Sequence, residues 1–248
     1  MSSQEFSAGG YRYIPGVFQY SAGVAALEGF RIERVMFARP VPLRQGFDRI
    51  AAHLAAIGRP AAAFSACELR SPAPMSEAAF AAFNTLYVSV LSEWGIVRDA
   101  LNPVARSNVC PELTPPAEPS FHAFSFTVPK VGAPPTFVIS GSGEVPEGKA
   151  NYRDHIVRPG DASPAGLKAK ASFVLDEMER RLAALGFGWA DVTATQVYSV
   201  HDIHPLLADP IIPRGAAPQG VVWHYCRPPV AGLDYEMDCR GVAVERVI

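Results

Sequence analysis

The fold of this chain is decided by a stretch that occurs twice. Residues 47–71 have the sequence FDRIAAHLAAIGRPAAAFSACELRS, and residues 175–199 have the sequence LDEMERRLAALGFGWADVTATQVYS. The two align without a gap at an offset of 128 residues, with identities such as Leu54 with Leu182 and Gly58 with Gly186. Self-similarity at one fixed offset is typical of a repeated structural unit. We therefore interpret the 248 residues as a duplication.

Each copy predicts a helix followed by a strand. Apolar residues recur at helical spacing, a glycine ends the helix, and a short apolar or β-branched run follows. We expect a further helix over 76–95 and paired strands at 18–27 and 30–38. Strands are also expected at 136–144, 220–228 and 233–244, the last two flanking a turn. Two strands, helix, strand, helix and two strands form an α+β unit whose helices cover one sheet face.

A proline-rich stretch marks the expected boundary between the two lobes. Residues 110–120 have the sequence CPELTPPAEPS, which predicts an irregular connection. We place an N-terminal lobe at residues 1–120 and a C-terminal lobe at residues 121–248.

Composition excludes several classes of protein. The chain is 49% hydrophobic, enough for a packed core, and its net charge is −2, so it lacks the cationic surplus of a general nucleic-acid binder. No run reaches the roughly 18 apolar residues of a membrane span. The four cysteines form no zinc-type spacing and suit a reducing compartment. We expect a cytoplasmic protein with no nucleic-acid or membrane partner.

No metal site is expected. His201 and His204 are spaced so that two imidazoles could lie near each other, but Pro205 follows and no convincing third ligand is present. The metal interpretation is therefore set aside.

One segment resembles the RidA/YjgF/YER057c family. The helix FAAFNTLYVSVLSEWG followed by NPVARSNV matches the family's F-x-x-x-N-x-x-Y helix and P-x-A-R-x-x-V strand. The matching residues are Phe80, Asn84, Tyr87, Pro103, Ala105, Arg106 and Val109. The resemblance implies two RidA-like, chorismate-mutase-like lobes, each a mixed and mainly antiparallel sheet with helices packed on one face.

The C-terminal lobe resembles the family in other places. FVISGSGEVP is similar to the family's strand and S-G-Q-x-P loop, here Ser140, Gly141, Ser142 and Pro146. YEMDCRGVAV is similar to its final acidic strand and places Glu236 and Asp238 at the acidic positions.

Each lobe also departs from the family pattern. The C-terminal lobe has no F-x-x-x-N-x-x-Y helix; Gly220 stands at the aligned arginine position, and Arg214 is out of register. The N-terminal lobe has FHAFSFTVP in place of the acidic strand. Each lobe therefore keeps a different half of the expected site.

The resemblance implies a hydrolytic deaminase that needs no cofactor and releases ammonia from a small enamine or imine carboxylate, of 2-aminoacrylate or 2-aminomuconate type. It also implies a homo-oligomer, with a trimer favoured and sites between neighbouring units. Arg106 is the expected clamp for the substrate carboxylate, because a guanidinium donates two parallel hydrogen bonds. Its alternative role is a structural salt bridge.

Two carboxylates are expected to act in catalysis, Glu236 and Glu144, by activating a water molecule. For Glu236 the alternative is an acidic strand residue that faces solvent. Ser140, Gly141 and Ser142 would steer the polar intermediate. Asn84 and Tyr87 would line the pocket or serve helix packing. Arg106 is expected to face Ser140, Glu144 and Glu236 of another lobe, either in the same chain or in a neighbour.

Two other functions stay open at this point. One is a chorismatase-like hydrolase of another small unsaturated carboxylate, since chorismatase-type hydrolases also contain RidA-like units. The other is a RidA-like protein that binds a small molecule without converting it.

Overall fold

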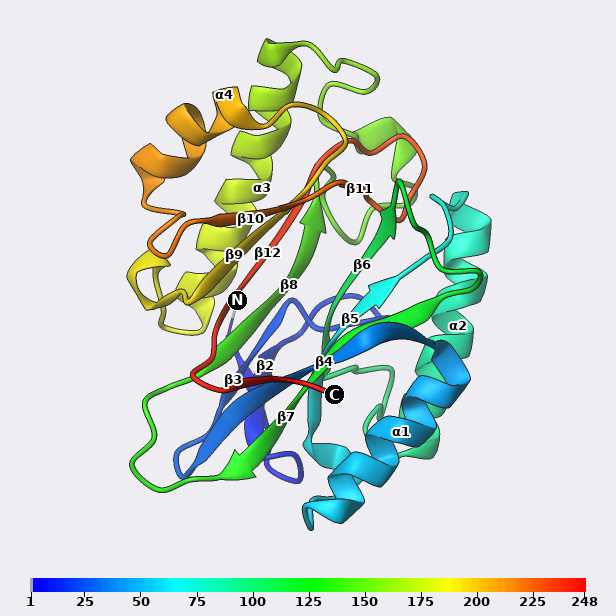
Figure 1. Cartoon of the computed structure of the whole chain (residues 1–248), viewed down its shortest axis with the longest axis vertical. Coiled ribbons are helices and arrows are strands. Elements are labelled where there is room, and N and C mark those ends of the chain that lie inside the picture. Colours follow the sequence, from blue (N-terminus) through cyan, green and yellow to red (C-terminus); the bar gives the residue numbers. More distant parts are fainter. Residues whose placement is uncertain (1) are drawn as a thin grey trace.

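Two mixed β-sheets pack against each other, and each carries helices on one face (Figure 1). The structure is a computed structural model and describes residues 2–248. The α+β class with helices on one face of each sheet agrees with the sequence prediction.

The first sheet has six strands in the order β11-β6-β5-β7-β4-β13. Its strands are β4 (Phe30–Pro42), β5 (Phe64–Arg70), β6 (Ala105–Pro111), β7 (Ser120–Pro129), β11 (Cys226–Arg227) and β13 (Glu245–Val247). Helices α1 (Leu43–Ala56) and α2 (Glu77–Glu93) pack on it.

The second sheet has seven strands in the order β1-β2-β3-β8-β12-β9-β10. Its strands are β1 (Gln4–Phe6), β2 (Tyr11–Ile14), β3 (Gly23–Ala26), β8 (Phe137–Gly143), β9 (Ala194–Tyr198), β10 (Val221–His224) and β12 (Glu236–Gly241). Helices α3 (Pro164–Ala184) and α4 (His204–Leu206) cover this sheet.

The duplication appears as a shared topology. In the first sheet β5 pairs in parallel with β6 and antiparallel with β7, which in turn pairs with β4. In the second sheet β9 pairs in parallel with β10 and antiparallel with β12, which in turn pairs with β8. We call residues 30–129 the first unit and residues 137–241 the second unit.

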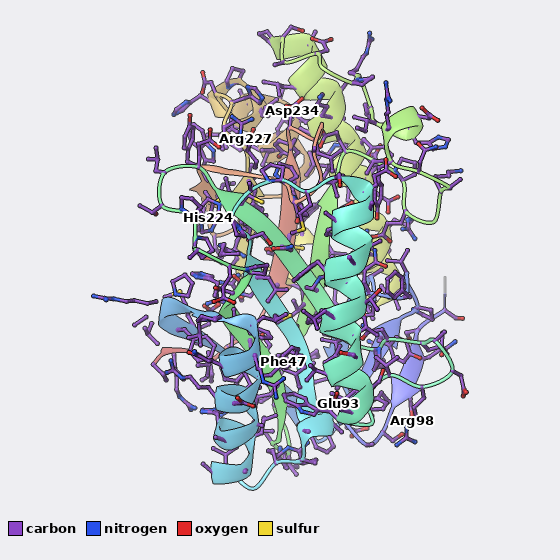
Figure 2. The ribbon with its side chains drawn as sticks, turned by 90° about the vertical axis from the view of Figure 1, so that its right-hand side faces the viewer. Phe47, Glu93, Arg98, His224, Arg227 and Asp234 are labelled. Carbon is purple, nitrogen blue, oxygen red and sulfur yellow. The ribbon has the colours of Figure 1, made fainter. Side chains whose placement is uncertain are left out.

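The local chemistry of the helices follows the sequence. Ser76 and Ser163 cap α2 and α3 by accepting hydrogen bonds from the backbone N–H groups of Ala79 and Gly166. Phe47 of α1 is enclosed by the first core, edge-on to Trp94 at 5.3 Å, and Figure 2 shows it between α1 and α2. The second core forms separately beneath α3.

The expected pairing of the strands at 18–27 and 30–38 is wrong. β3 pairs with β2 and β8, whereas β4 pairs with β7 and β13. The turn between them contains Gly29 at φ +81°, and it carries the chain from one sheet to the other. The two strands therefore belong to different sheets and do not form a hairpin.

The last two expected strands flank a turn but are not neighbours in the sheet, because β9 lies between β10 and β12. The sheets moreover exchange strands across residue 120. β1, β2 and β3 lie in the second sheet, and the proline-rich stretch joins β6 to β7 inside the first. The lobes predicted as 1–120 and 121–248 are therefore not separate sheets.

Within residues 2–248, no helix combines the length and the apolar character that a bilayer crossing requires.

Candidate active site

Strand β6 of the first unit runs beside β8 of the second unit (Figure 1). A cavity opens between residues of β6, β8 and β12. Its space amounts to about 480 Å³, open solvent at the mouth included. Its lining residues are Tyr20, Phe80, Arg106, Asn108, Gly141, Ser142, Gly143, Val145, Glu147, Tyr152, Pro229, Val230, Leu233 and Glu236. One chain thus brings together Arg106, Gly141, Ser142 and Glu236, four of the residues that the sequence singled out.

Arg106 supplies the cation of the cavity. Its side chain comes from β6, and the residue is only 3% exposed. Nη2 donates a 2.7 Å hydrogen bond to Oδ1 of Asn84 on α2. Nη1 is buried and has no hydrogen-bond partner among the described residues. A buried donor without a partner is costly, so this nitrogen is suited to a ligand oxygen.

Aromatic rings hold the guanidinium in place. Its Cζ lies 4.8 Å from the ring centre of Tyr87 and 5.2 Å from that of Tyr20. Tyr87 is fully buried and its hydroxyl meets the Cys67 thiol, so it supports Arg106 and does not line the cavity. Asn84 has a similar supporting role, through its hydrogen bond to Nη2.

Ser140 fixes the strands on either side of the site. Its hydroxyl donates to the Ser21 carbonyl at 2.6 Å and accepts from the Arg106 backbone N–H at 3.0 Å. The side chain is fully buried and outside the cavity lining. Ser140 therefore ties β8 to β6, and of the predicted loop Gly141 and Ser142 reach the cavity.

Glu236 supplies the carboxyl group. It begins β12, is 4% exposed, and lines the cavity with Arg106. Burial, followed by the nearby charges of Asp238 and Glu144, raises the pKa of Glu236 well above its ordinary value of 4.5, against the opposing effect of Arg106 and Arg70. A carboxyl with a raised pKa keeps its proton to a higher pH than an ordinary carboxyl and can act as an acid.

Gly141 makes room for that carboxyl. A Cβ atom at this position would overlap Oε1 of Glu236 and lie 3.3 Å from Cα of Ser107. Only a residue without a side chain allows Glu236 to lie across β8, which gives the glycine of the S-G-S-G sequence a physical reason.

Asp238, the other acidic residue of β12, is used for structure. Its oxygens accept hydrogen bonds from Ser107 Oγ at 2.5 Å, Gln196 Nε2 at 2.7 Å and Tyr198 Oη at 2.9 Å. It is buried between the two sheets and does not line the cavity.

The position of Glu144 favours a structural role over the predicted catalytic one. It is fully buried and accepts hydrogen bonds from the backbone N–H groups of Asp234 at 2.6 Å and Tyr235 at 3.1 Å. Lys170 of α3 lies between Glu144 and Asp234, the latter labelled in Figure 2, and forms ion pairs with both. Both carboxylate oxygens of Glu144 are engaged in these contacts, which anchor the segment leading into β12.

Sequence reasoning missed several lining residues. Tyr20 donates to Glu147 at 2.8 Å, and Arg181 Nη2 pairs with the same carboxylate at 3.0 Å. Tyr152 belongs to a segment held by Glu77, which accepts from its backbone N–H. The lining residues Tyr20, Glu147 and Tyr152 come from loops that have no recognisable motif. Asn108, two residues beyond Arg106 on the same strand, could have been found from strand alternation.

His201 and His204 contact different carboxylates. His201 meets Asp234 at 3.2 Å, and His204 meets Asp202 at 2.6 Å on the surface. Across residues 2–248, no group of three or more His, Cys, Asp or Glu side chains is arranged to hold a metal ion.

The register of the second unit places a different residue at the arginine position. In the first unit Arg106 pairs with Cys67 of β5. The repeat offset of 128 residues takes Cys67 to Thr195, which pairs with Val221 of β10. Val221, rather than Gly220, is therefore the counterpart. Arg214 pairs with Asp176 and Glu179 of α3.

The chain is similar to known proteins in sequence and in fold. A family model described as 2-aminomuconate deaminase CnbZ matches residues 3–246. A 2-amino-5-chloromuconate deaminase from Comamonas testosteroni is 54% identical over 245 residues, which cover 98% of each chain. The crystal structure of a chorismatase covers 92% of this chain and 79% of its own, with a TM-score of 0.55 at 12% identity, and so shares the fold. The YjgF gene product from E. coli covers 43% of this chain and 80% of its own at 18% identity, with a TM-score of 0.33, too low to establish a shared fold.

Proposed function

The chain belongs to the CnbZ family of 2-aminomuconate deaminases, and we propose that it hydrolyses a 2-aminomuconate-type enamine dicarboxylate in the cavity between its two units. The observation that carries this proposal is the buried Nη1 of Arg106, which has no partner among the described residues and shares a cavity with Glu236. The expectation of a chorismatase-like hydrolase rests on the fold alone, at 12% identity.

The first task of the site is to hold the carboxylate next to the reacting carbon. Asn84 fixes one side of the Arg106 guanidinium, and the stacked tyrosines fix its plane. The guanidinium then donates to the substrate carboxylate in one orientation, which positions the neighbouring C–N group in the cavity.

The second task is proton transfer. The raised pKa of Glu236 favours its protonated form, so the carboxyl begins as a general acid. It gives its proton to a carbon of the dienamine, and the C–N group becomes an iminium. The resulting carboxylate then accepts a proton from water while the hydroxide oxygen bonds to the iminium carbon.

Release of ammonia completes the reaction. The amine of the carbinolamine takes the proton that Glu236 now holds, the C–N bond breaks as ammonia leaves, and the hydroxyl becomes a carbonyl as it gives its proton to the Glu236 carboxylate. The balance is enamine plus water giving ketone plus ammonia. Glu236 serves first as acid and then as base, so one carboxyl is sufficient and Glu144 is not required.

The proposal is tested by ammonia release from freshly generated 2-aminomuconate. We expect activity in the native chain and a loss of roughly a hundredfold in kcat/KM in Arg106→Ala, since the charge-assisted hydrogen bond from Nη1 to the substrate carboxylate is removed. Arg106→Lys keeps the charge without the planar fork and should lose less. Arg214→Ala, at an arginine outside the cavity lining that pairs with surface carboxylates of α3, should keep native activity.

Two outcomes would contradict the proposal. Retention of native activity in a folded Arg106→Ala variant would remove the carboxylate clamp. Thermal stabilisation of the native chain by substrate, without ammonia release, would favour the non-catalytic binding protein.

A further inference from the structure

The cavity contains a second buried polar group without a partner. Asn108 of β6 lines it and is 3% exposed. Its Oδ1 accepts a 2.9 Å hydrogen bond from the Ser71 hydroxyl. Its Nδ2 is buried and has no hydrogen-bond partner among the described residues. The proposed chemistry at Arg106 and Glu236 makes no use of this group.

The chemistry of the free half of the amide defines what it can bind. Because Ser71 occupies the oxygen, the group that remains is an NH₂ donor, and its partner must be an acceptor. A carboxylate oxygen is a strong acceptor for such a donor, whereas a substrate amine would bring a second donor to it.

The spacing to Arg106 suits a dicarboxylate. Arg106 and Asn108 are alternate residues of one strand, so their side chains leave the same face roughly 6.6 Å apart. These two strand positions are about as far apart as the two carboxyl carbons of an extended six-carbon diacid. The cavity thus has free donors at two points, a cation at one and a neutral amide at the other.

The remaining lining suits the hydrocarbon between two carboxylates. Val145, Val230 and Leu233 provide apolar surface in the same cavity. Glu147, the other acid of the lining besides Glu236, is neutralised by Arg181 and also accepts from Tyr20. A second substrate carboxylate therefore meets little uncompensated negative charge.

We propose that Asn108 is a specificity-determining residue whose Nδ2 donates to the substrate carboxylate far from the reacting C–N group. It selects six-carbon dicarboxylates over monocarboxylates such as 2-aminoacrylate. This inference rests on the proposed function, because it assumes that Arg106 binds the near carboxylate.

Two unreactive acids test the inference without any turnover. Hexa-2,4-dienedioate and hexa-2,4-dienoate have the same six-carbon diene and differ only in the far carboxylate. We expect calorimetry to show the native chain binding the diacid about tenfold more tightly or better, as for one hydrogen bond to a charged group. Asn108→Ala should reduce the preference to within about threefold, and Asn108→Asp, which places like charge at the far carboxylate, should reverse it.

Asn102→Ala is the matched control. Asn102 is equally buried at 3% exposure, but its amide accepts from the Val104 backbone N–H outside the cavity. This variant controls for the stability lost with a buried amide and should keep the native preference for the diacid.

The outcomes separate this inference from the proposed function. A native chain without diacid preference, including one that binds neither acid, overturns the inference, and so does full preference in Asn108→Ala. If the native chain prefers the diacid through Asn108 but releases no ammonia from 2-aminomuconate, the proposed function fails while the subsite stands. If ammonia is released and Asn108 has no effect, only the subsite fails.

Discussion

In the first unit β6, β5, β7 and β4 lie side by side in that order, and in the second unit β10, β9, β12 and β8 do the same. The functional side chains do not follow this symmetry. Arg106 of β6 has Val221 of β10 as its counterpart, so only the first unit supplies a cation there. Helix α2, which carries Asn84, corresponds to a chain interrupted by prolines at 205, 210 and 213.

The acidic position shows the reverse difference. In the first unit Arg70 of β5 pairs with Ser120 of β7. The repeat offset of 128 residues takes Arg70 to Tyr198, which pairs with Glu236 of β12. Ser120 is therefore the counterpart of Glu236, so only the second unit supplies a carboxyl. The duplication thus produced two sets of positions, of which one combination, Arg106 with Glu236, provides both a cation and a carboxyl group. The chain joins that pair in one cavity.

The largest difference in activity between the two units is expected when Glu236 and its counterpart Ser120 are substituted in separate variants. Glu236→Gln should lower kcat for ammonia release by roughly a thousandfold, because the amide neither gives nor takes the proton. Ser120→Ala should change kcat less than threefold, since Ser120 is outside the cavity lining and bonds the Glu118 carbonyl. Equal losses in both variants, measured by steady-state ammonia release, would remove the distinction between the units.

A smaller effect, on stability, comes from the same carboxyl. Because burial raises its pKa in the folded state, Glu236 contributes stability that is complete below the ordinary pKa of 4.5 and is lost as pH rises toward the folded-state pKa. Each tenfold difference in proton affinity corresponds to about 1.4 kcal/mol. Glu236→Gln should therefore gain unfolding free energy over the native chain between pH 5 and pH 8, by denaturant titration. Ser120→Ala should show no such trend, and a gain that is independent of pH would mean that the raised pKa of Glu236 is not its cause.

The least change in activity is expected at Glu144, another buried carboxylate of the second unit. Glu144→Gln should reduce unfolding free energy by about 1–3 kcal/mol, because it disturbs a buried acceptor of two backbone N–H groups and the ion pair with Lys170. Its kcat should stay within about threefold of native at a temperature where the variant is folded. A fall in kcat as large as that of Glu236→Gln would restore a catalytic role to Glu144.

Local patterns predicted much of this architecture. The repeated helix and strand, the capping serines and the placement of Asn84 and Arg106 on a neighbouring helix and strand all depend on residues close in sequence. Helical periodicity, caps and strand alternation act over such distances. The α+β class followed from those patterns, and a deaminase of 2-aminomuconate type followed from the resemblance to the RidA/YjgF/YER057c family, whereas the family that matches the chain is CnbZ.

Long-range pairing could not be predicted in the same way. Nothing in the turn around Gly29 shows that it sends β4 to a different sheet from β3. Glu144 follows the S-G-S-G loop, yet its partners are backbone groups of Asp234 and Tyr235, which only the folded chain brings near. Tyr20 and Glu147 reach the cavity from loops that share no motif. The predicted trimer stays a prediction.

Mixing two inactive variants tests whether Arg106 and Glu236 of the same chain form one site. Arg106→Ala and Glu236→Gln chains are co-expressed with different affinity tags, and the doubly tagged assemblies are assayed for ammonia release. A site shared between chains would regain both groups in some assemblies. We predict that mixed assemblies, or a monomeric mixture, are as inactive as either variant alone. Recovery of a substantial fraction of native activity on mixing would contradict a site built within one chain.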